Sequence, residues 1–379
     1  MRQLYLDYNA TTPIAPSVQE AMLPLLVEHF GNPSSNHAKG RAAAEAVEDA
    51  RGHLAVLLGC DPDEIVFTSG GTESNNLALQ GVLFRQAPAA GGHLIISAIE
   101  HPSVAAPARF LERLGYDVTI VGVTGQGVVQ PAAVRAAIRP DTRLVSVMHA
   151  NNEVGTIQPL RQIAAICHEH EIPLHTDASQ SVGKIGTLVD ELEVDLLTVA
   201  GHKMYAPKGV GALYVRRGVE IEPTQHGAGH EAGLRAGTEN VASIAGLGRA
   251  ASLAAKSLDQ ARERLTLLRD RLWQQLVAEI GSRLVLHAAL VERLPNTLSV
   301  AFPGVSGQEL LARIPELCAS TGSACHSTGS SISPTLAAMG VTDEVARGTV
   351  RLSVGWQTTD DEVDRAASLL LGAWEALRG

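Results

Sequence analysis

Lys203 is the residue whose type and setting first suggest covalent chemistry. It follows His202 directly, after the apolar strand-like run 196–199, and a Gly/Pro-rich stretch leads away from it. A lysine among small apolar neighbours loses hydration, so its pKa falls and its amine becomes a Schiff-base nucleophile. A lysine that merely extends from a strand end to solvent fits this segment equally well. A second segment favours the chemical interpretation.

That segment lies upstream, where the short apolar run from Pro173 ends in Asp177 and Gln180 follows. In enzymes that use pyridoxal 5'-phosphate (PLP), an aspartate pairs with the protonated ring nitrogen and lets the ring act as an electron sink. A second polar side chain then binds the ring hydroxyl. An isolated Asp at a strand end is usually a turn or cap residue. With Lys203 it forms a pair that suits PLP.

A third segment, 65–76, offers a site for the phosphate of such a cofactor. Three apolar residues run into Thr68-Ser-Gly-Gly-Thr72, and a helix-favouring sequence follows. A Gly/Ser/Thr turn at a helix N-terminus presents free N–H groups and the positive end of the helix dipole to an anion. The same residues also suit an ordinary capped helix start. The pattern is neither a Walker loop nor a dinucleotide fingerprint.

Taken with further motifs, these segments make the chain resemble the cysteine desulfurases of the class V aminotransferase group from end to end. The motifs, in chain order, are Tyr5–Pro13, Gly31–His37, Thr68–Ser74, Glu100–His101, His149–Gly155, Asp177–Gln180, Gly201–Lys203, Arg235–Asn240, Gly322–Cys325 and Arg351–Gly355. So many matches in the correct order are far more specific than any one of them.

The resemblance implies a catalytic set of Lys203, Cys325 and His101. Lys203 would hold PLP as a Schiff base and move the substrate α-proton, while His101 stacks on the ring and assists acid–base steps. Cys325 would take sulfur from L-cysteine as a persulfide, leaving alanine, and deliver it to an acceptor protein. Its small, polar loop would not bury a structural cysteine, which supports a reactive one.

The resemblance also implies the binding residues. Substrate would be held by Asn152 and by Arg351, which clamps the carboxylate bidentately. One cofactor contact, Thr238, would come from the neighbouring subunit, so a homodimer with composite sites is expected. The cofactor-binding set that the resemblance assigns is Gly71, Thr72, His101, Asn152, Asp177, Gln180, His202, Lys203 and Thr238.

One position departs from the family pattern, and rival functions remain open. Many relatives carry a phosphate-contacting serine where this chain has Ala200, which puts one contact in doubt. The Cys325-His-Ser opening is similar to selenocysteine lyases, so release of selenide and alanine from L-selenocysteine is the main alternative. A transaminase leaves Cys325 without a task, and a non-catalytic scaffold for sulfur carriers needs no Schiff-base lysine. The sulfur's destination stays open among iron–sulfur cluster assembly, tRNA thiolation and DNA phosphorothioation.

Composition excludes several other classes of protein. The 379 residues carry a formal charge of −10, and the pI near 5.8 argues against nucleic-acid binding. No apolar run reaches membrane-spanning length, and the start of the chain lacks a signal-peptide pattern, so we expect a cytoplasmic protein. Four cysteines are too few for a disulfide framework, and Cys167 and Cys318 are expected in the core. The histidines 168, 170 and 175 lack metal-ligand spacing, so no metal is expected.

The order of predicted elements indicates an α/β fold. Strand-like runs (64–67, 93–97, 117–121, 143–148, 172–176, 196–199, 211–215) alternate with helical stretches (42–58, 103–114, 132–138, 160–170), which predicts a mostly parallel sheet covered on both faces. The resemblance implies the PLP-dependent transferase fold (fold type I). We expect a large PLP-binding domain over 15–249. A smaller α+β domain over 1–14 and 250–379 would carry the cysteine loop, with a helix from Val241 to Ile280 as connector.

Overall fold

A mostly parallel sheet forms the centre of the larger part of the molecule. The structure is a computed structural model that describes residues 3–85, 91–321 and 332–378. Within these ranges one sheet has seven strands in the order β2-β8-β7-β6-β5-β3-β4, and of them β8 runs antiparallel to both neighbours. The strands are β2 (Ile65–Thr68), β3 (His93–Ser97), β4 (Asp117–Val121), β5 (Thr142–Ser146), β6 (Leu174–Asp177), β7 (Leu196–Ala200) and β8 (Gly211–Val215). This confirms the predicted fold class.

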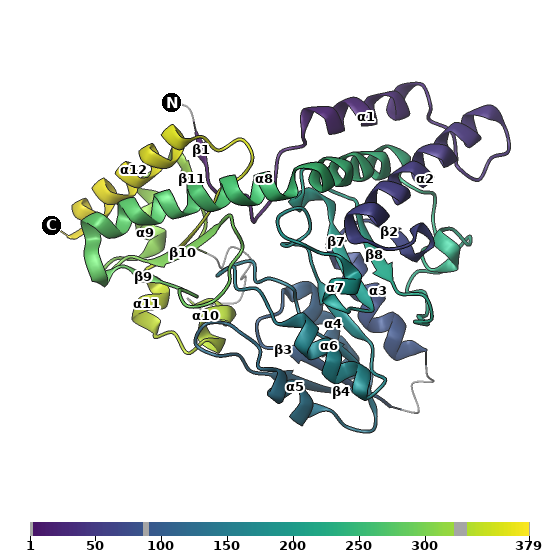
Figure 1. Cartoon of the computed structure of the whole chain (residues 1–379), viewed down its shortest axis with the longest axis horizontal. Helices are drawn as coiled ribbons and strands as arrows, with labels where there is room; N and C mark the ends of the chain where they lie inside the picture. The colour runs from purple at the N-terminus through teal and green to yellow at the C-terminus, as the bar shows by residue number, and fades with distance from the viewer. Residues whose placement is uncertain (1–2, 86–90, 322–331, 379) are drawn as a thin grey trace.

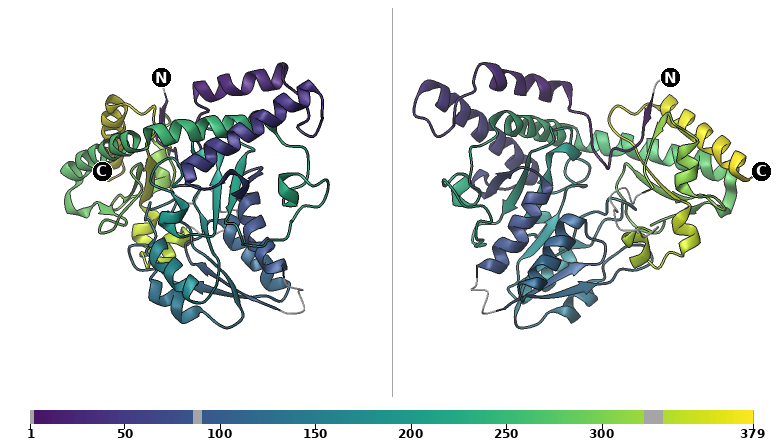
Figure 2. Two further views of the ribbon diagram at one scale, coloured as in Figure 1. Left: turned by 45° about the vertical axis from the view of Figure 1, so that its right-hand side comes forward. Right: turned by 180° about the vertical axis from the view of Figure 1, so that it is seen from behind.

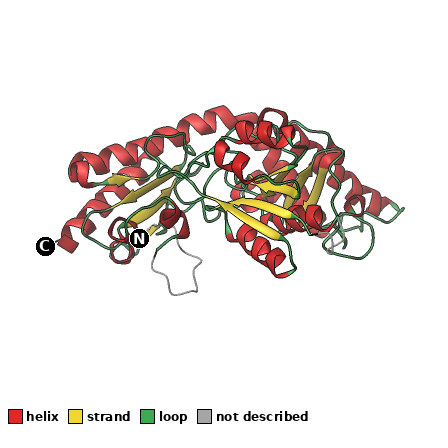
Figure 3. Ribbon diagram, turned by 90° about the horizontal axis from the view of Figure 1, so that it is seen from below, coloured by secondary structure: helices red, strands yellow, loops and turns green. Residues whose placement is uncertain are grey.

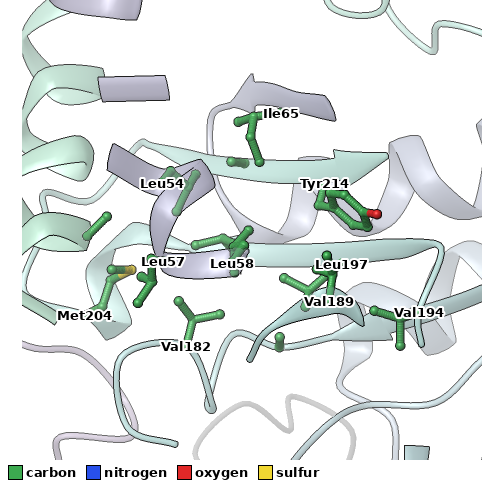
Figure 4. Packing of buried hydrophobic residues seen from close by; sticks show 14 of the residues in the cluster. Leu54, Leu57, Leu58, Ile65, Val182, Val189, Val194, Leu197, Met204 and Tyr214 are labelled. Atoms are coloured by element: carbon green, nitrogen blue, oxygen red, sulfur yellow. The ribbon is translucent and has the colours of Figure 1, made fainter. Parts of the chain in front are cut away.

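Helices cover both faces of this sheet. Successive strand side chains point to opposite faces, and since both sets are apolar, both faces must be buried. Ile65 and Phe67 join the core beneath α2 (Ala38–Leu58) and α6 (Leu160–Glu169), whereas Val66 joins the core beneath α3 (Gly71–Phe84) and α4 (Pro102–Arg113). Figure 4 shows α2 side chains packed among strand residues of the first core. The remaining helices of this part are α1 (Pro16–Val27), α5 (Pro131–Ala137) and α7 (Val189–Leu192).

The long helix α8 (Val241–Ile280) crosses from this part to a second one, as Figure 1 shows. The side chain of Asn240 caps its start by accepting from the Ser243 N–H, and Gly281, with φ 73°, ends it. The first half packs against α1 and α2. Apolar residues of its second half, from Leu265 to Ile280, belong to a separate core.

That second core lies under a small antiparallel sheet in the order β12-β10-β9. The chain's first strand, β1, belongs to this part and pairs in parallel with β11. Both ends of the chain therefore lie in the same part of the molecule (Figures 2 and 3). Leu4 and Leu6 are buried in the same core. The elements are β1 (Leu4–Tyr5), β9 (Val285–Leu286), β10 (Thr297–Ala301), β11 (Leu317–Cys318), β12 (Thr349–Ser353), α9 (Gly307–Ala312), α10 (Pro334–Ala338), α11 (Asp343–Arg347) and α12 (Asp360–Arg378).

Most predicted elements agree with the structure within a few residues, and the connector helix agrees at both ends. The burial expected for Cys318 is wrong: Cys167 is fully buried, but Cys318 is partly exposed. Leu317 points into the second core, and the next strand residue, Cys318, points to the opposite face. Among the described residues, none of the helices is both long and apolar enough to cross a membrane.

Candidate active site

A cavity of about 350 Å³ lies where the carboxyl ends of the parallel strands meet the N-terminal segment and β12. Ligands of open α/β sheets bind at this edge. Its lining contains Asn9, Ala10, Gly71, Thr72, His101, Ser103, Met148, Ala150, Asn152, Asp177, Ser179, Gln180, Ala200, His202, Lys203 and Arg351. Nine of the predicted site residues therefore face one cavity, although they come from distant parts of the chain.

Lys203 reaches the cavity from the 3₁₀ turn Gly201–Lys203, which directly follows β7. The turn needs glycine at its first position, because a Cβ on Gly201 would lie 2.9 Å from the Val210 carbonyl oxygen. The Lys203 Nζ donates to the backbone carbonyls of Asn9 at 2.5 Å and Ala10 at 2.8 Å. The N-terminal segment thus holds the amine at the cavity wall.

Asp177 is the last residue of β6 and accepts two hydrogen bonds. The Ser179 N–H donates to Oδ1 at 2.9 Å, and Asn75 Nδ2 donates to Oδ2 at 2.8 Å. Asn75 is fully buried on α3 and also donates to Ser103 Oγ at 2.8 Å. These donors fix the carboxylate and leave it able to bind a protonated ring nitrogen.

His101 caps the start of α4 and belongs to the same network. Its Nδ1 accepts from the Ser103 N–H at 3.1 Å and lies 2.7 Å from Ser103 Oγ. Burial lowers the pKa of His101, while Asp177 opposes and Lys203 adds to that change. Since Nδ1 acts as an acceptor, the neutral ring carries its proton on Nε2.

The start of α3 and the turn after β7 form the wall expected to receive phosphate. Gly71 and Thr72 begin α3, a 14-residue helix whose first N–H groups have no partner within the helix. A Cβ on Gly71 would lie 3.0 Å from Ser179 Oγ and 3.2 Å from the Ala200 Cβ, so glycine keeps this wall open. His202 lines the same wall, and burial, with Lys203 next, lowers its pKa to about 4.

Arg351 enters the cavity from β12 and is 5% exposed. Its Nη2 forms an ion pair with Asp7 Oδ1 at 2.7 Å, and its Nη1 donates to the Asn152 backbone oxygen at 3.0 Å. Its Nε is buried and has no hydrogen-bond partner among the described residues. The guanidinium is therefore held in place next to Asn152, where it can bind a carboxylate.

One predicted site residue stands apart from the cavity, and another is not described by the structure. Thr238 is exposed on the segment between β8 and α8, away from the cavity of its own chain. Cys325 lies outside the described residues. Conversely, Asn75 and Ser103 are part of the site although sequence reasoning assigned them no role. Asn75 directly follows the Thr68–Ser74 motif, and Ser103 lies two residues after His101. Their position next to these motifs is the sequence feature that could have identified them.

The residues around the cavity fit PLP. A lysine amine, a carboxylate held by two donors and a helix N-terminus are the three features that the cofactor's aldehyde, ring nitrogen and phosphate require. The described residues contain no group of three histidine, cysteine, aspartate or glutamate side chains placed to bind a metal ion.

Comparison with known proteins agrees with this geometry. The model of the family described as aminotransferase class-V matches residues 4–366. The chain belongs to the class V aminotransferase family. It is accordingly a PLP-dependent enzyme of fold type I.

Three relatives illustrate the likeness. A protein of Dictyoglomus turgidum named cysteine desulfurase IscS is 46% identical over 379 residues, which cover 100% of this chain and 96% of the relative. A solved structure named NifS-like protein has a TM-score of 0.91 at 37% identity, covering 99% of each chain. A structure described as SspA in complex with cysteine has a TM-score of 0.83 at 38% identity, covering 92% of this chain and 98% of the other.

Proposed function

We propose that this protein is a cysteine desulfurase, which converts L-cysteine to L-alanine and transfers the sulfur to Cys325. The observation that carries the proposal is one cavity bounded by the Lys203 amine, the Asp177 carboxylate and the anchored Arg351 guanidinium. The relative of Dictyoglomus turgidum, at 46% identity, and two others at 44% and 43% identity bear the name cysteine desulfurase IscS. Selenocysteine lyase, the alternative raised by the Cys-His-Ser opening, is not favoured by these relatives.

In this proposal the chain's residues hold the cofactor from several sides. Gly71, Thr72 and His202 would bind its phosphate, and Asp177 would bind the ring nitrogen. Asn152 and Gln180 would bind the ring hydroxyl, and His101 would face the ring. When bound, PLP supplies an electron sink that weakens bonds at the substrate α-carbon and the adjacent C–S bond.

The chemistry assigned to the residues balances. Arg351 and Asn152 bind the carboxylate of L-cysteine, and the Lys203 amine takes and returns protons at the substrate carbons. The Cys325 thiolate attacks the substrate sulfur, so an S–S bond forms while the C–S bond breaks. The carbon keeps that electron pair and takes a proton. One thiol and L-cysteine thus become one persulfide and L-alanine.

We propose further that the protein is a homodimer in which Thr238 contacts the phosphate bound by the partner subunit. The exposed position of Thr238, outside its own cavity, supports this role. Mixing Lys203→Ala and Thr238→Ala proteins is expected to form hybrid dimers with altered activity. A fully active monomer in sedimentation would contradict the composite site.

Three coarser expectations accompany this function. We place the protein in the cytoplasm, and the free thiols of Cys60, Cys167 and Cys318 fit a reducing compartment. We propose the division into domains 15–249 and 1–14 with 250–379, which the two separate cores support. The sulfur acceptor is a protein, and iron–sulfur cluster assembly is the first destination to test.

Cys325→Ala tests the proposed function against selenocysteine lyase. We expect the variant to lose persulfide and nearly all alanine formation from L-cysteine, because sulfur leaves only to a thiolate. It is expected to keep alanine release from L-selenocysteine, because selenium leaves more readily and the cofactor set is intact. Alanine is measured with both substrates, and mass spectrometry detects an added sulfur atom on Cys325. A variant that desulfurates L-cysteine at the wild-type rate would refute the assignment.

A further inference from the structure

Lys184 is a buried lysine that the proposed chemistry does not use. It is 6% exposed and lies one helical turn after Gln180, in the segment between β6 and α7. Lysine is almost never buried to this degree without a partner, because removing an ammonium from water is costly. We therefore expect the buried ammonium to have a hydrogen-bond partner, and the structure shows one on Gln180.

The Lys184 ammonium determines how the Gln180 amide is oriented. Lys184 Nζ donates to Gln180 Oε1 at 3.0 Å, and Gln180 Nε2 donates to the Asn9 carbonyl at 3.0 Å. Rotating the amide by 180° would place its NH₂ against the ammonium and its oxygen against the carbonyl, so both bonds would be lost. The same Asn9 carbonyl accepts from Lys203 Nζ. Lys184 thus keeps the donor end of Gln180 on the side of the reactive amine.

The charge of Lys184 is not balanced by a neighbouring acid. Within the described parts of the chain no carboxylate forms an ion pair with it. Burial first, and then the positive charges of Lys203 and Arg351, lower its pKa to about 7. The charged and titratable groups around Lys184 and Lys203 are Asp177, Arg351 with its ion-pair partner Asp7, Lys208, His101 and His202. This surplus of positive groups suits a site that binds an anionic cofactor.

We propose that Lys184 is a positioning residue of the cofactor site, which holds the Gln180 amide as a donor to the anionic ring oxygen and adds a positive charge behind it. The inference rests on the proposed place of Gln180 at the ring hydroxyl. A nearby positive charge stabilises the ring oxygen anion and disfavours a proton on the lysine–cofactor nitrogen. Lys184 thereby tunes the protonation of the bound cofactor without touching substrate.

The test compares K184M, K184Q and K184R as PLP-loaded full-length proteins. K184M removes charge and donor, K184Q keeps a donor, and K184R keeps both. A pH titration of the visible cofactor band is expected to shift its midpoint upward by about one unit in K184M and K184Q but not in K184R. During dialysis K184M is expected to lose PLP about tenfold faster than wild type, since a charge-assisted hydrogen bond is gone. Lys256→Met, on an exposed position of α8, is the control for losing one positive charge.

The outcomes separate this inference from the proposed function. An unchanged midpoint in both neutral variants, with only a lower unfolding temperature, would show that Lys184 has a purely structural role and overturn the inference. Failure of both neutral variants to fold while K184R folds would overturn it as well. If wild type shows no visible band that borohydride reduces onto Lys203, the proposed function fails instead.

Discussion

Glu231→Gln is expected to destabilise the protein strongly, because Glu231 anchors a long irregular segment to the sheet. Its carboxylate accepts from Arg51 Nη1 and Nη2, each at 3.0 Å, and from the Phe67 N–H at 2.7 Å. The side chains of Glu231 and Arg51 are 1% and 10% exposed. The segment that Glu231 holds also carries Thr238, so the contact links stability to the proposed composite site.

The expected magnitude follows from this burial. Breaking a buried ion pair by removing one charge costs about 3–5 kcal/mol. Arg51 keeps a second ion pair with Glu48 Oε1 at 3.1 Å, on the exposed side, so the lower end of this range applies. The amide oxygen of glutamine keeps at most part of the three bonds, and its NH₂ must face a donor. We therefore expect a loss of about 3 kcal/mol in the free energy of unfolding. The matched control is Glu220→Gln, whose partner Arg85 lies on the surface, with side chains 70% and 49% exposed. Such a pair contributes about 0–1 kcal/mol.

Urea unfolding at pH 7 and one protein concentration measures both variants against wild type. The reasoning is refuted if Glu231→Gln costs less than about 1 kcal/mol, the range of an exposed pair. It is also refuted if the two variants cost the same. A loss confined to Glu231→Gln supports the anchoring role of the Arg51 pair.

Three further perturbations test the site and the core. Lys203→Ala is expected to abolish turnover and leave any PLP noncovalently bound; a borohydride-reduced adduct on another lysine of wild type would contradict the assignment. Ala200→Ser is expected to bind PLP about threefold to tenfold more tightly, because the serine hydroxyl adds one hydrogen bond to the phosphate. Cofactor titration of the apoprotein measures the affinity, and weaker binding would show that the site cannot accommodate this hydrogen bond. Burial lowers the pKa of His287 to about 4, so the unfolded chain takes up the proton first and stability falls as pH drops from 6.5 to 4, by up to about 3 kcal/mol. His287→Gln is expected to remove only this share of the pH dependence, because burial also lowers the pKa of His149, His175 and His202 to about 4. His53→Gln, on an exposed position, is expected to leave the dependence unchanged, and equal pH profiles of all three proteins would refute the burial argument.

The sequence by itself determined the local elements and much of the site's chemistry. Apolar runs with turn residues predicted the strands, and the placement of Asp177 and Lys203 at strand ends predicted that they meet at one edge of the sheet. These inferences succeed because strand length, helix periodicity and turn preference depend on neighbouring residues. The resemblance then brought Arg351 and Asn152 into the same hypothesis, although they are far apart along the chain.

Only the tertiary structure decided which side chains hold the reactive ones. The Asn9 carbonyl that receives Lys203 lies 194 positions away in sequence, and the Arg51–Glu231 pair spans 180. Neither contact leaves a periodic signal, because each depends on how the sheet, the N-terminal segment and the irregular segment pack together. Lys184 shows the same limit: its sequence neighbourhood is that of an ordinary turn lysine, and only burial beside Gln180 gives its charge a consequence.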